Sequence, residues 1–254
     1  MSAGLGHLYL VPAPLDFGCA QQSPLEDSMP LQTLRVAASL QHWVCENAKS
    51  TRAYLKRVGE IVPLQVAIQA QTLVELPREV HKKGDHQAGF DARPLLGALL
   101  AGHDLGLVSE AGMPAVADPG SSVVRAAHQL GITVVPLVGP VSLLLALASS
   151  GLNGQNFAFV GYVPSDAAER AQRVKTLESL ALKTQQTQLF IETPYRNQAL
   201  LATLLQTLQP STRLATSSGL TLANACNRSA DVKTWKSRGW ALDNAAPTVF
   251  AIGP

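Results

Sequence analysis

The sequence predicts an α/β protein of two lobes, with a mostly parallel sheet in the N-terminal lobe and a mixed sheet in the C-terminal lobe. In the first half, short β-branched apolar runs alternate with helical patterns, which is typical of parallel strands joined by crossover helices. Near residue 138 the pattern changes, because Gly139-Pro140 precedes a helix of small residues. The length of 254 residues suits one large domain or two smaller ones. We therefore expect an N-terminal α/β lobe at 1–137 and a C-terminal α/β lobe at 138–254.

The N-terminal lobe supplies five short apolar runs as strand candidates. They are Leu8–Val11, Trp43–Cys45, Leu64–Ile68, Leu105–Ser109 and Ile132–Pro136. The helices predicted between them are Thr33–Leu40, Ser50–Val58, Pro94–Ala101 and Ser121–Leu130. Segments 15–30 and 77–92 are predicted loops, because Gly, Pro, charged and amide residues interrupt the apolar periodicity there. Open α/β sheets bind ligands at the carboxyl ends of their strands, so the turns that follow these runs are candidate binding loops.

The C-terminal lobe continues with alternating helices and strands. The predicted helices are Val141–Ser150, Asp166–Leu182 and Asn197–Leu208. The predicted strands are Phe157–Val160, Gln188–Ile191, Thr212–Thr216 and Thr248–Ile252.

The charge balance excludes a strongly basic protein that would hold nucleic acid by bulk electrostatics. The chain has 20 Lys and Arg against 18 Asp and Glu, a net charge of +2. Residues 1–137 hold 10 basic against 12 acidic side chains, and residues 138–254 hold 10 against 6. A polyanion would therefore prefer the C-terminal lobe.

Cysteine usage favours a reducing compartment. Cys19, Cys45 and Cys226 are isolated thiols with no CxxC spacing, which fits the cytoplasm better than a secreted disulfide framework. We find no signal peptide pattern. The longest apolar stretch, 134–148, is interrupted by Pro and Gly and is too short to span a bilayer. The sequence thus predicts a cytoplasmic protein without a membrane partner.

Several common chemistries lack their sequence signatures. There is no GxGxxG after a strand, no GxxxxGK[ST] and no GxSxG, which argues against standard dinucleotide, P-loop and hydrolase sites. His81, Asp85 and His86 share a loop, but that spacing is weak support for a metal, and we predict no metal site. Two loops remain as candidates: Ser109–Gly120, between a strand and a helix, and Val135–Ser142 around Gly139-Pro140.

Five stretches in the same order resemble the tetrapyrrole methylase superfamily, and within it the branch that methylates cytidine 2′-hydroxyls of small-subunit ribosomal RNA. They are Val11–Leu15, Ser109–Pro114 with Asp118-Pro119-Gly120, Val135–Pro140, Phe159–Pro164 and Phe190–Arg196. The likeness runs from about residue 7 to 253. It implies a two-lobed α/β fold similar to tetrapyrrole methylases, a homodimer and S-adenosylmethionine held in the cleft between the lobes.

The resemblance also assigns residues. The methyl donor would be gripped mainly by backbone atoms of these loops. The implied cofactor-binding positions are Pro14, Ser109, Glu110, Ala111, Gly112, Asp118, Pro140, Val141, Ser142, Tyr162 and Pro194. A 2′-hydroxyl acceptor needs a base to take its proton, for which Glu46 and Glu192 are the candidates. An RNA acceptor would lie against the C-terminal lobe, where Arg170, Arg173, Lys175 and Arg196 offer positive charge.

Some acceptor-side positions differ from the family pattern. Asn47 stands where the family has Asp after Glu46, and Ser217–Leu222 lacks two charged residues of a late family motif. These differences leave other readings open: a changed acceptor, a non-catalytic S-adenosylmethionine-binding or regulatory protein, or a tetrapyrrole or corrin methyltransferase. The chain lacks the GxGPGD-type start that is usual for tetrapyrrole and corrin methyltransferases.

Overall fold

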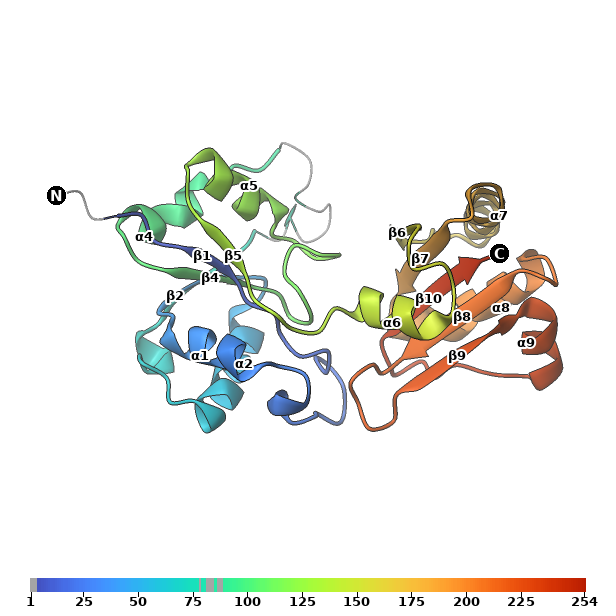
Figure 1. The fold of residues 1–254 in the computed structure, drawn as a ribbon, viewed down its shortest axis with the longest axis horizontal. Helices are drawn as coiled ribbons and strands as arrows, with labels where there is room; N and C mark the ends of the chain where they lie inside the picture. Colours follow the sequence, from blue (N-terminus) through green and yellow to red (C-terminus); the bar gives the residue numbers. More distant parts are fainter. Residues whose placement is uncertain (1–3, 78, 81–84, 86–88) are drawn as a thin grey trace. The chain divides into compact units, whose positions relative to one another are not determined.

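The computed structural model describes residues 4–77, 79–80, 85 and 89–254. The chain forms two compact units. Unit 1 holds residues up to Phe17 and Pro24–Pro140, and unit 2 holds Gly18–Ser23 and Val141–Pro254. Figure 1 shows an α/β arrangement within each unit. We expected the boundary at 137/138, and the contacts divide the chain between Pro140 and Val141.

Unit 1 is built on a parallel sheet, as the sequence predicts. The strands are β1 (Leu8–Leu10), β2 (His42–Cys45), β3 (Thr72–Glu75), β4 (Leu105–Val108) and β5 (Val134–Pro136), in the order β3-β2-β4-β1-β5. Every pairing in this sheet is parallel. All the carboxyl ends therefore lie at one edge of the sheet, and the loops that leave them are the natural place for a ligand.

Helices cover both faces of this sheet (Figure 1). On one face lie α1 (Leu31–Ser39) and α2 (Ala48–Ile61), which pack around the buried Trp43. On the other lie α4 (Gly97–Leu100) and α5 (Ser121–Gln129), which pack around Leu107. Short 3₁₀ helices η1 (Leu25–Asp27), η2 (Ile68–Ala70) and η3 (Arg93–Leu96) lie in the connections. Burial on both faces explains why the central strands read as continuous apolar runs.

Unit 2 contains a mixed sheet. The strands are β6 (Phe157–Tyr162), β7 (Thr187–Glu192), β8 (Arg213–Ser218), β9 (Cys226–Asp231) and β10 (Thr248–Gly253), in the order β6-β7-β10-β8-β9. β6 and β7 are parallel and the other pairings are antiparallel. The predicted fold class is thus confirmed for both sheets.

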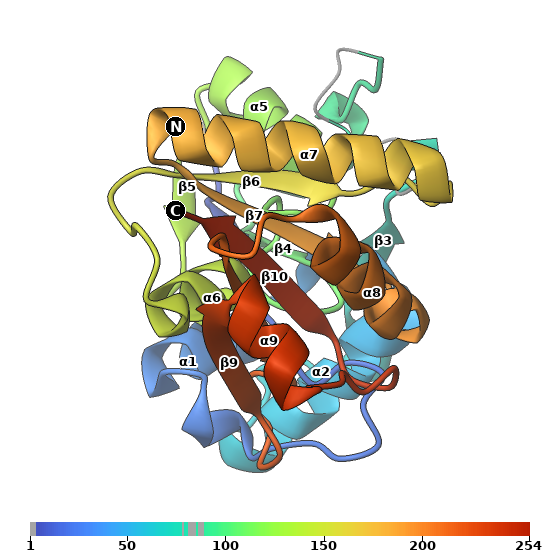
Figure 2. The same ribbon diagram turned by 90° about the vertical axis from the view of Figure 1, so that its right-hand side faces the viewer.

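One face of the second sheet is covered by α7 (Ala167–Thr184), α8 (Asn197–Thr207) and α9 (Val232–Arg238), as Figure 2 shows. These helices bury Phe190, Phe250 and Trp235. The opposite face packs against α6 (Ser142–Ser150) through Leu189 and Val249. The short η4 (Pro194–Arg196) leads from β7 into α8.

Two details differ from the sequence prediction. Leu64–Ile68 is not a strand, and the edge strand is instead Thr72–Glu75. The polar strand Cys226–Asp231 and the helix Val232–Arg238 were not predicted. Of the helices in the described part of the chain, none is long and apolar enough to cross a membrane.

Candidate functional site

Three loops at the carboxyl edge of unit 1 meet around Gly112. They follow β1, β4 and β5. Ala13 and Gly112 exchange two backbone hydrogen bonds, each 2.9 Å. Gly112 has φ +71°, and a Cβ placed there would lie 3.3 Å from the Leu15 side chain and 3.6 Å from the Pro140 carbonyl oxygen. A side chain at this position would therefore fill the space between the loops, which we call the Gly112 cradle.

The loop after β5 also approaches the loop after β1 closely. A Cβ on Gly139 would lie only 2.3 Å from Cγ of Pro12. Because the proline ring is rigid, only glycine allows this approach. The predicted residues Pro14, Gly112 and Pro140 thus belong to loops that converge within unit 1.

The loop 109–120 has an unusual backbone. Ala115 and Ala117 have φ of 64° and 67°, a left-handed conformation that costs a non-glycine residue about 1 kcal/mol or more. Such strain persists only where the surroundings enforce it, and it is common in ligand-binding loops. Ser109, at the start of the loop, is buried.

Carboxylates gather at this edge from separate parts of the sequence. The Glu110 N–H donates to Oε2 of Glu46 at 3.2 Å, which joins the loop after β4 to the end of β2. Burial, with smaller contributions from the nearby Glu46 and Glu110, raises the pKa of Asp118 to about 7. Asp118 therefore exchanges its proton near neutral pH.

Asn47, which replaces the family's Asp, has a structural task. Its Oδ1 accepts from the N–H groups of Lys49 (2.9 Å) and Ser50 (3.3 Å), so it caps the N-terminus of α2. Glu75 accepts from the Ala48 N–H at 2.7 Å. Asparagine caps a helix about as well as aspartate, which explains why the fold tolerates the exchange.

Asp85 also caps a helix. It accepts from the backbone of Gly120 and Ser122 and from the hydroxyls of Ser121 and Ser122, at 2.7–2.8 Å, at the start of α5. Burial alone would raise the pKa of Asp85, but these hydrogen bonds together lower it below the usual carboxyl range. His81 and His86 lie outside the described residues. Among the described residues there is no group of three or more His, Cys, Asp or Glu placed to hold a metal.

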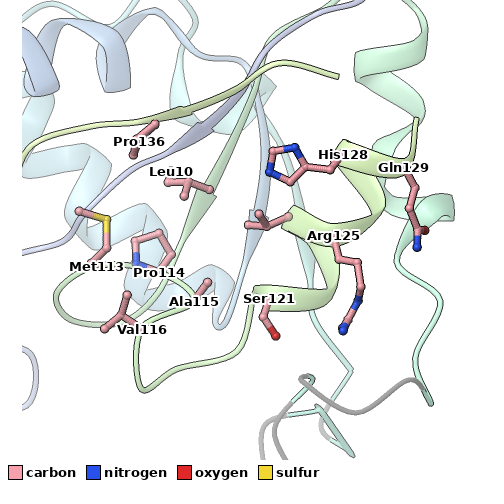
Figure 3. Close-up of a pocket in the computed structure, with 11 residues that line it drawn as sticks. Leu10, Met113, Pro114, Ala115, Val116, Ser121, Arg125, His128, Gln129 and Pro136 are labelled. Carbon is pink, nitrogen blue, oxygen red and sulfur yellow. The ribbon is translucent and has the colours of Figure 1, made fainter. Parts of the chain in front are cut away.

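A hollow of about 830 Å³ lies beside the same loop (Figure 3). Its walls are Met113–Val116, Leu10 and Pro136, and Arg125 and His128 of α5 border it. The loop 109–120 thus faces the cradle through Gly112 and the hollow through residues 113–116. Asp85 also holds Arg125 at the border of the hollow, since the Asp85 carbonyl oxygen accepts from Arg125 at 2.8 Å.

Glu192, the other predicted base, lies in unit 2 at the end of β7. Its Oε1 accepts from the Thr193 N–H at 2.7 Å and pairs with Nη2 of Arg196 at 2.8 Å. The Glu192 side chain is fully buried. A buried carboxylate paired with an arginine is better suited to holding that arginine than to taking a substrate proton.

The remaining predicted contacts also lie in unit 2. Val141 is the residue before α6 and Ser142 is its first residue. Tyr162 ends β6 and is exposed. Pro194 begins η4. For these residues a role in donor binding stays a prediction.

Sequence reasoning missed Asp85 and the titration of Asp118. The signal for Asp85 was the uncapped start of α5, Gly120-Ser121-Ser122, which needs an acceptor from elsewhere in the chain. The raised pKa of Asp118 comes first from its burial and then from Glu46 and Glu110, and the burial cannot be read from the residues around Asp118.

Comparison with known proteins decides the family. The ribosomal RNA small subunit methyltransferase I of Mesorhizobium japonicum is 30% identical over 248 residues, which cover 97% of this chain and 75% of that protein. The chain belongs to this family. The methyltransferase I of Micromonospora olivasterospora is 32% identical over 81% of the chain and 57% of its own length. No family model matches the chain.

Solved structures give separate support for the fold of this chain. Uroporphyrin-III-C-methyltransferase from Thermus thermophilus matches with a TM-score of 0.54 at 19% identity, over 98% of this chain and 94% of that one. The methyltransferase CobJ matches with a TM-score of 0.55 at 17% identity and the same coverage. The tetrapyrrole methylase fold is therefore confirmed. Homology supports a methyltransferase that uses S-adenosylmethionine.

Proposed function

We propose that this chain transfers a methyl group from S-adenosylmethionine to a ribose 2′-hydroxyl of small-subunit ribosomal RNA. The observation that carries the proposal is the Gly112 cradle, where backbone groups of three loops converge at the carboxyl edge of a parallel sheet. The methyltransferase I relatives supply the acceptor class.

The residues of the cradle fit the donor. A Cβ on Gly112 would obstruct the space between Leu15 and Pro140, so the glycine leaves room for a ligand against the backbone. Glu110 and Asp118 add carboxylates, which suit the ribose hydroxyls and positive groups of the donor. Pro14, Ser109, Ala111 and Pro140 would contribute backbone contacts.

Methyl transfer from S-adenosylmethionine needs no covalent intermediate with the protein. When bound, S-adenosylmethionine supplies an electrophilic methyl group with a neutral thioether as leaving group. The protein's residues position the acceptor oxygen in line with that methyl and exclude water. As the O–C bond forms and the C–S bond breaks, the hydroxyl proton passes to a base.

Glu46 is our candidate for that base. It is half-buried, directly follows β2 beside the cradle, and its Oε2 accepts from the Glu110 N–H. Glu192 instead holds Arg196. We expect Glu46→Gln to lower the methylation rate by about 10²–10⁴-fold, the usual contribution of a general base, without weakening donor binding.

The experiment offers labelled S-adenosylmethionine with two acceptors: small ribosomal subunits that lack their methyl marks, and uroporphyrinogen III. We expect label in RNA, recovered as a 2′-O-methyl nucleoside after digestion. Label in the tetrapyrrole alone would support the tetrapyrrole alternative and refute ours. Donor binding without transfer to either acceptor would support the non-catalytic alternative.

We further propose a homodimer, as the family resemblance suggests, and a cytoplasmic location, as the lack of a CxxC pattern suggests. Light scattering of the purified chain tests the dimer directly. A mass of one chain would refute it.

A further inference from the structure

Two exposed tyrosines mark the carboxyl end of the parallel strand pair in unit 2. Tyr162 ends β6 and is 58% exposed, and Tyr195 follows β7 and is 70% exposed. Phe190 and Trp235 of this unit are fully buried, and Phe157, at the opposite end of β6, is less exposed than either tyrosine. Exposing two aromatic rings on neighbouring strand ends forfeits burial energy, so they suit a partner that presents flat surfaces.

An arginine is fixed against one of these rings. The Arg196 guanidinium carbon lies 5.5 Å from the centroid of the Tyr195 ring. Its Nη2 pairs with Glu192 at 2.8 Å and its Nε donates to the Thr193 hydroxyl at 3.1 Å. Because Glu192 is fully buried, it anchors the guanidinium from the protein interior. Tyr195 and Arg196 therefore form a preorganised pair, which we call the Tyr195–Arg196 platform.

Further positive charge lies near the same strand ends. Arg170, in the first turn of α7, donates to the Ser165 carbonyl at 3.1 Å and to the Thr203 hydroxyl at 3.1 Å. Arg173 is exposed one turn later. Two acids lie at the start of α7. Asp166 accepts from two backbone N–H groups there, and Glu169 is exposed. The three arginines are matched by three acids, but Asp166 caps α7 and Glu192 is buried against Arg196, so the arginines are the groups best placed to meet phosphates.

We propose that the Tyr195–Arg196 platform binds an unpaired base of the RNA acceptor, which stacks on the Tyr195 ring while arginines contact the adjacent phosphates. Proteins that bind single-stranded RNA combine aromatic stacking with positive charge in this way. A base within a duplex cannot offer its face, so the platform selects an unpaired nucleotide. This inference rests on the proposed function, and it assigns the platform to the acceptor and not to the methyl donor.

The test measures binding of the full chain to a fluorescent single-stranded RNA of about 12 nucleotides with alternating C and U, a length within the usual site size of single-strand binders. We expect Tyr195→Ala to raise the Kd roughly 5- to 100-fold, the range expected for loss of one stacked base. Tyr195→Phe keeps the ring and should bind like the wild type. Annealing the RNA to its complement should abolish the difference between variants.

Two controls separate this inference from the proposed function. Phe157→Ala removes an exposed aromatic ring at the opposite end of β6 and should leave RNA binding unchanged. Binding of S-adenosylhomocysteine should be the same in every variant. If Tyr195→Ala binds RNA as the wild type does, or if Tyr195→Phe loses as much as Tyr195→Ala, the platform is refuted and the proposed function stands. If the wild type binds the donor product but no RNA, both the platform and the RNA acceptor are refuted.

Discussion

Asp118 gives the protein a pH-dependent stability that can be worked out from the structure. Burial and the neighbouring Glu46 and Glu110 raise the pKa of Asp118 to about 7 from an ordinary 3.8. Between these two values the folded chain keeps a proton that the unfolded chain has lost. Stability must therefore fall as the pH rises from about 4 to about 7, and this contribution levels off above that range.

The size of the effect follows from the shift. A shift of about three pKa units corresponds to about 4 kcal/mol between the protonation states. Asp118 is partly exposed, so screening by water reduces the expected effect to about 1–2 kcal/mol. Asp118→Asn removes the charge, and we expect this variant to be more stable than the wild type by that amount at pH 8 and equal to it at pH 4.

Urea unfolding at pH 4, 6 and 8 measures this difference, with tryptophan fluorescence as the signal. Trp43 is buried in unit 1 and reports on the unfolding of this unit, which also contains Asp118. Parallel stability curves for the wild type and Asp118→Asn across this pH range would show that the folded chain does not raise the pKa of Asp118. The reasoning about a buried carboxyl beside Glu46 and Glu110 would then be wrong.

Two further predictions concern the supports of the site. Asp85→Ala should lower the free energy of unfolding in urea by about 2 kcal/mol, because α5 loses its N-terminal cap. Since the pKa of Asp85 is lowered, the stability difference between the wild type and Asp85→Asn should shrink as the pH falls below the usual carboxyl range. A difference that grows in acid would contradict this. Asp16→Asn should cost about 2–3 kcal/mol, because it leaves Arg57 without the carboxylate that it grips at two 3.0 Å hydrogen bonds in a largely buried pair. Combining it with Arg57→Met should recover part of that loss, and strictly additive losses would count against the pair.

The sequence was a good guide where strands are buried on both faces. Leu105–Val108 is fully buried, so its continuous apolar run predicted a central parallel strand. The edge strands were harder. Thr72–Glu75 is largely exposed, so its pattern is a weaker strand signal than that of the more apolar Leu64–Ile68. Cys226–Asp231 is a polar edge strand whose pairing with β8 depends on tertiary context that its own residues do not signal.

The candidate site was predictable as loops but not as chemistry. Gly112 and Pro140 stood out as turn residues next to strand ends. Their meeting depends on strand order, which places β1 between β4 and β5. The pKa of Asp118 depends first on its burial and then on Glu46, which reaches the same edge only because β2 lies beside β4. Long-range electrostatics of this kind cannot be derived from local sequence.

The most direct test of the central claim is calorimetric titration of S-adenosylhomocysteine into three proteins: wild type, Gly112→Ala and Gly131→Ala. Gly112 and Gly131 have nearly the same φ, +71° and +69°, so alanine strains the backbone similarly at both. Only at Gly112 does the new Cβ meet other loops, because nothing lies within 4 Å of it at Gly131. We expect the wild type and Gly131→Ala to bind with equal affinity and Gly112→Ala to lose at least about tenfold, or about 1.4 kcal/mol. Equal binding by all three proteins, or none by the wild type, would contradict a donor site in the Gly112 cradle.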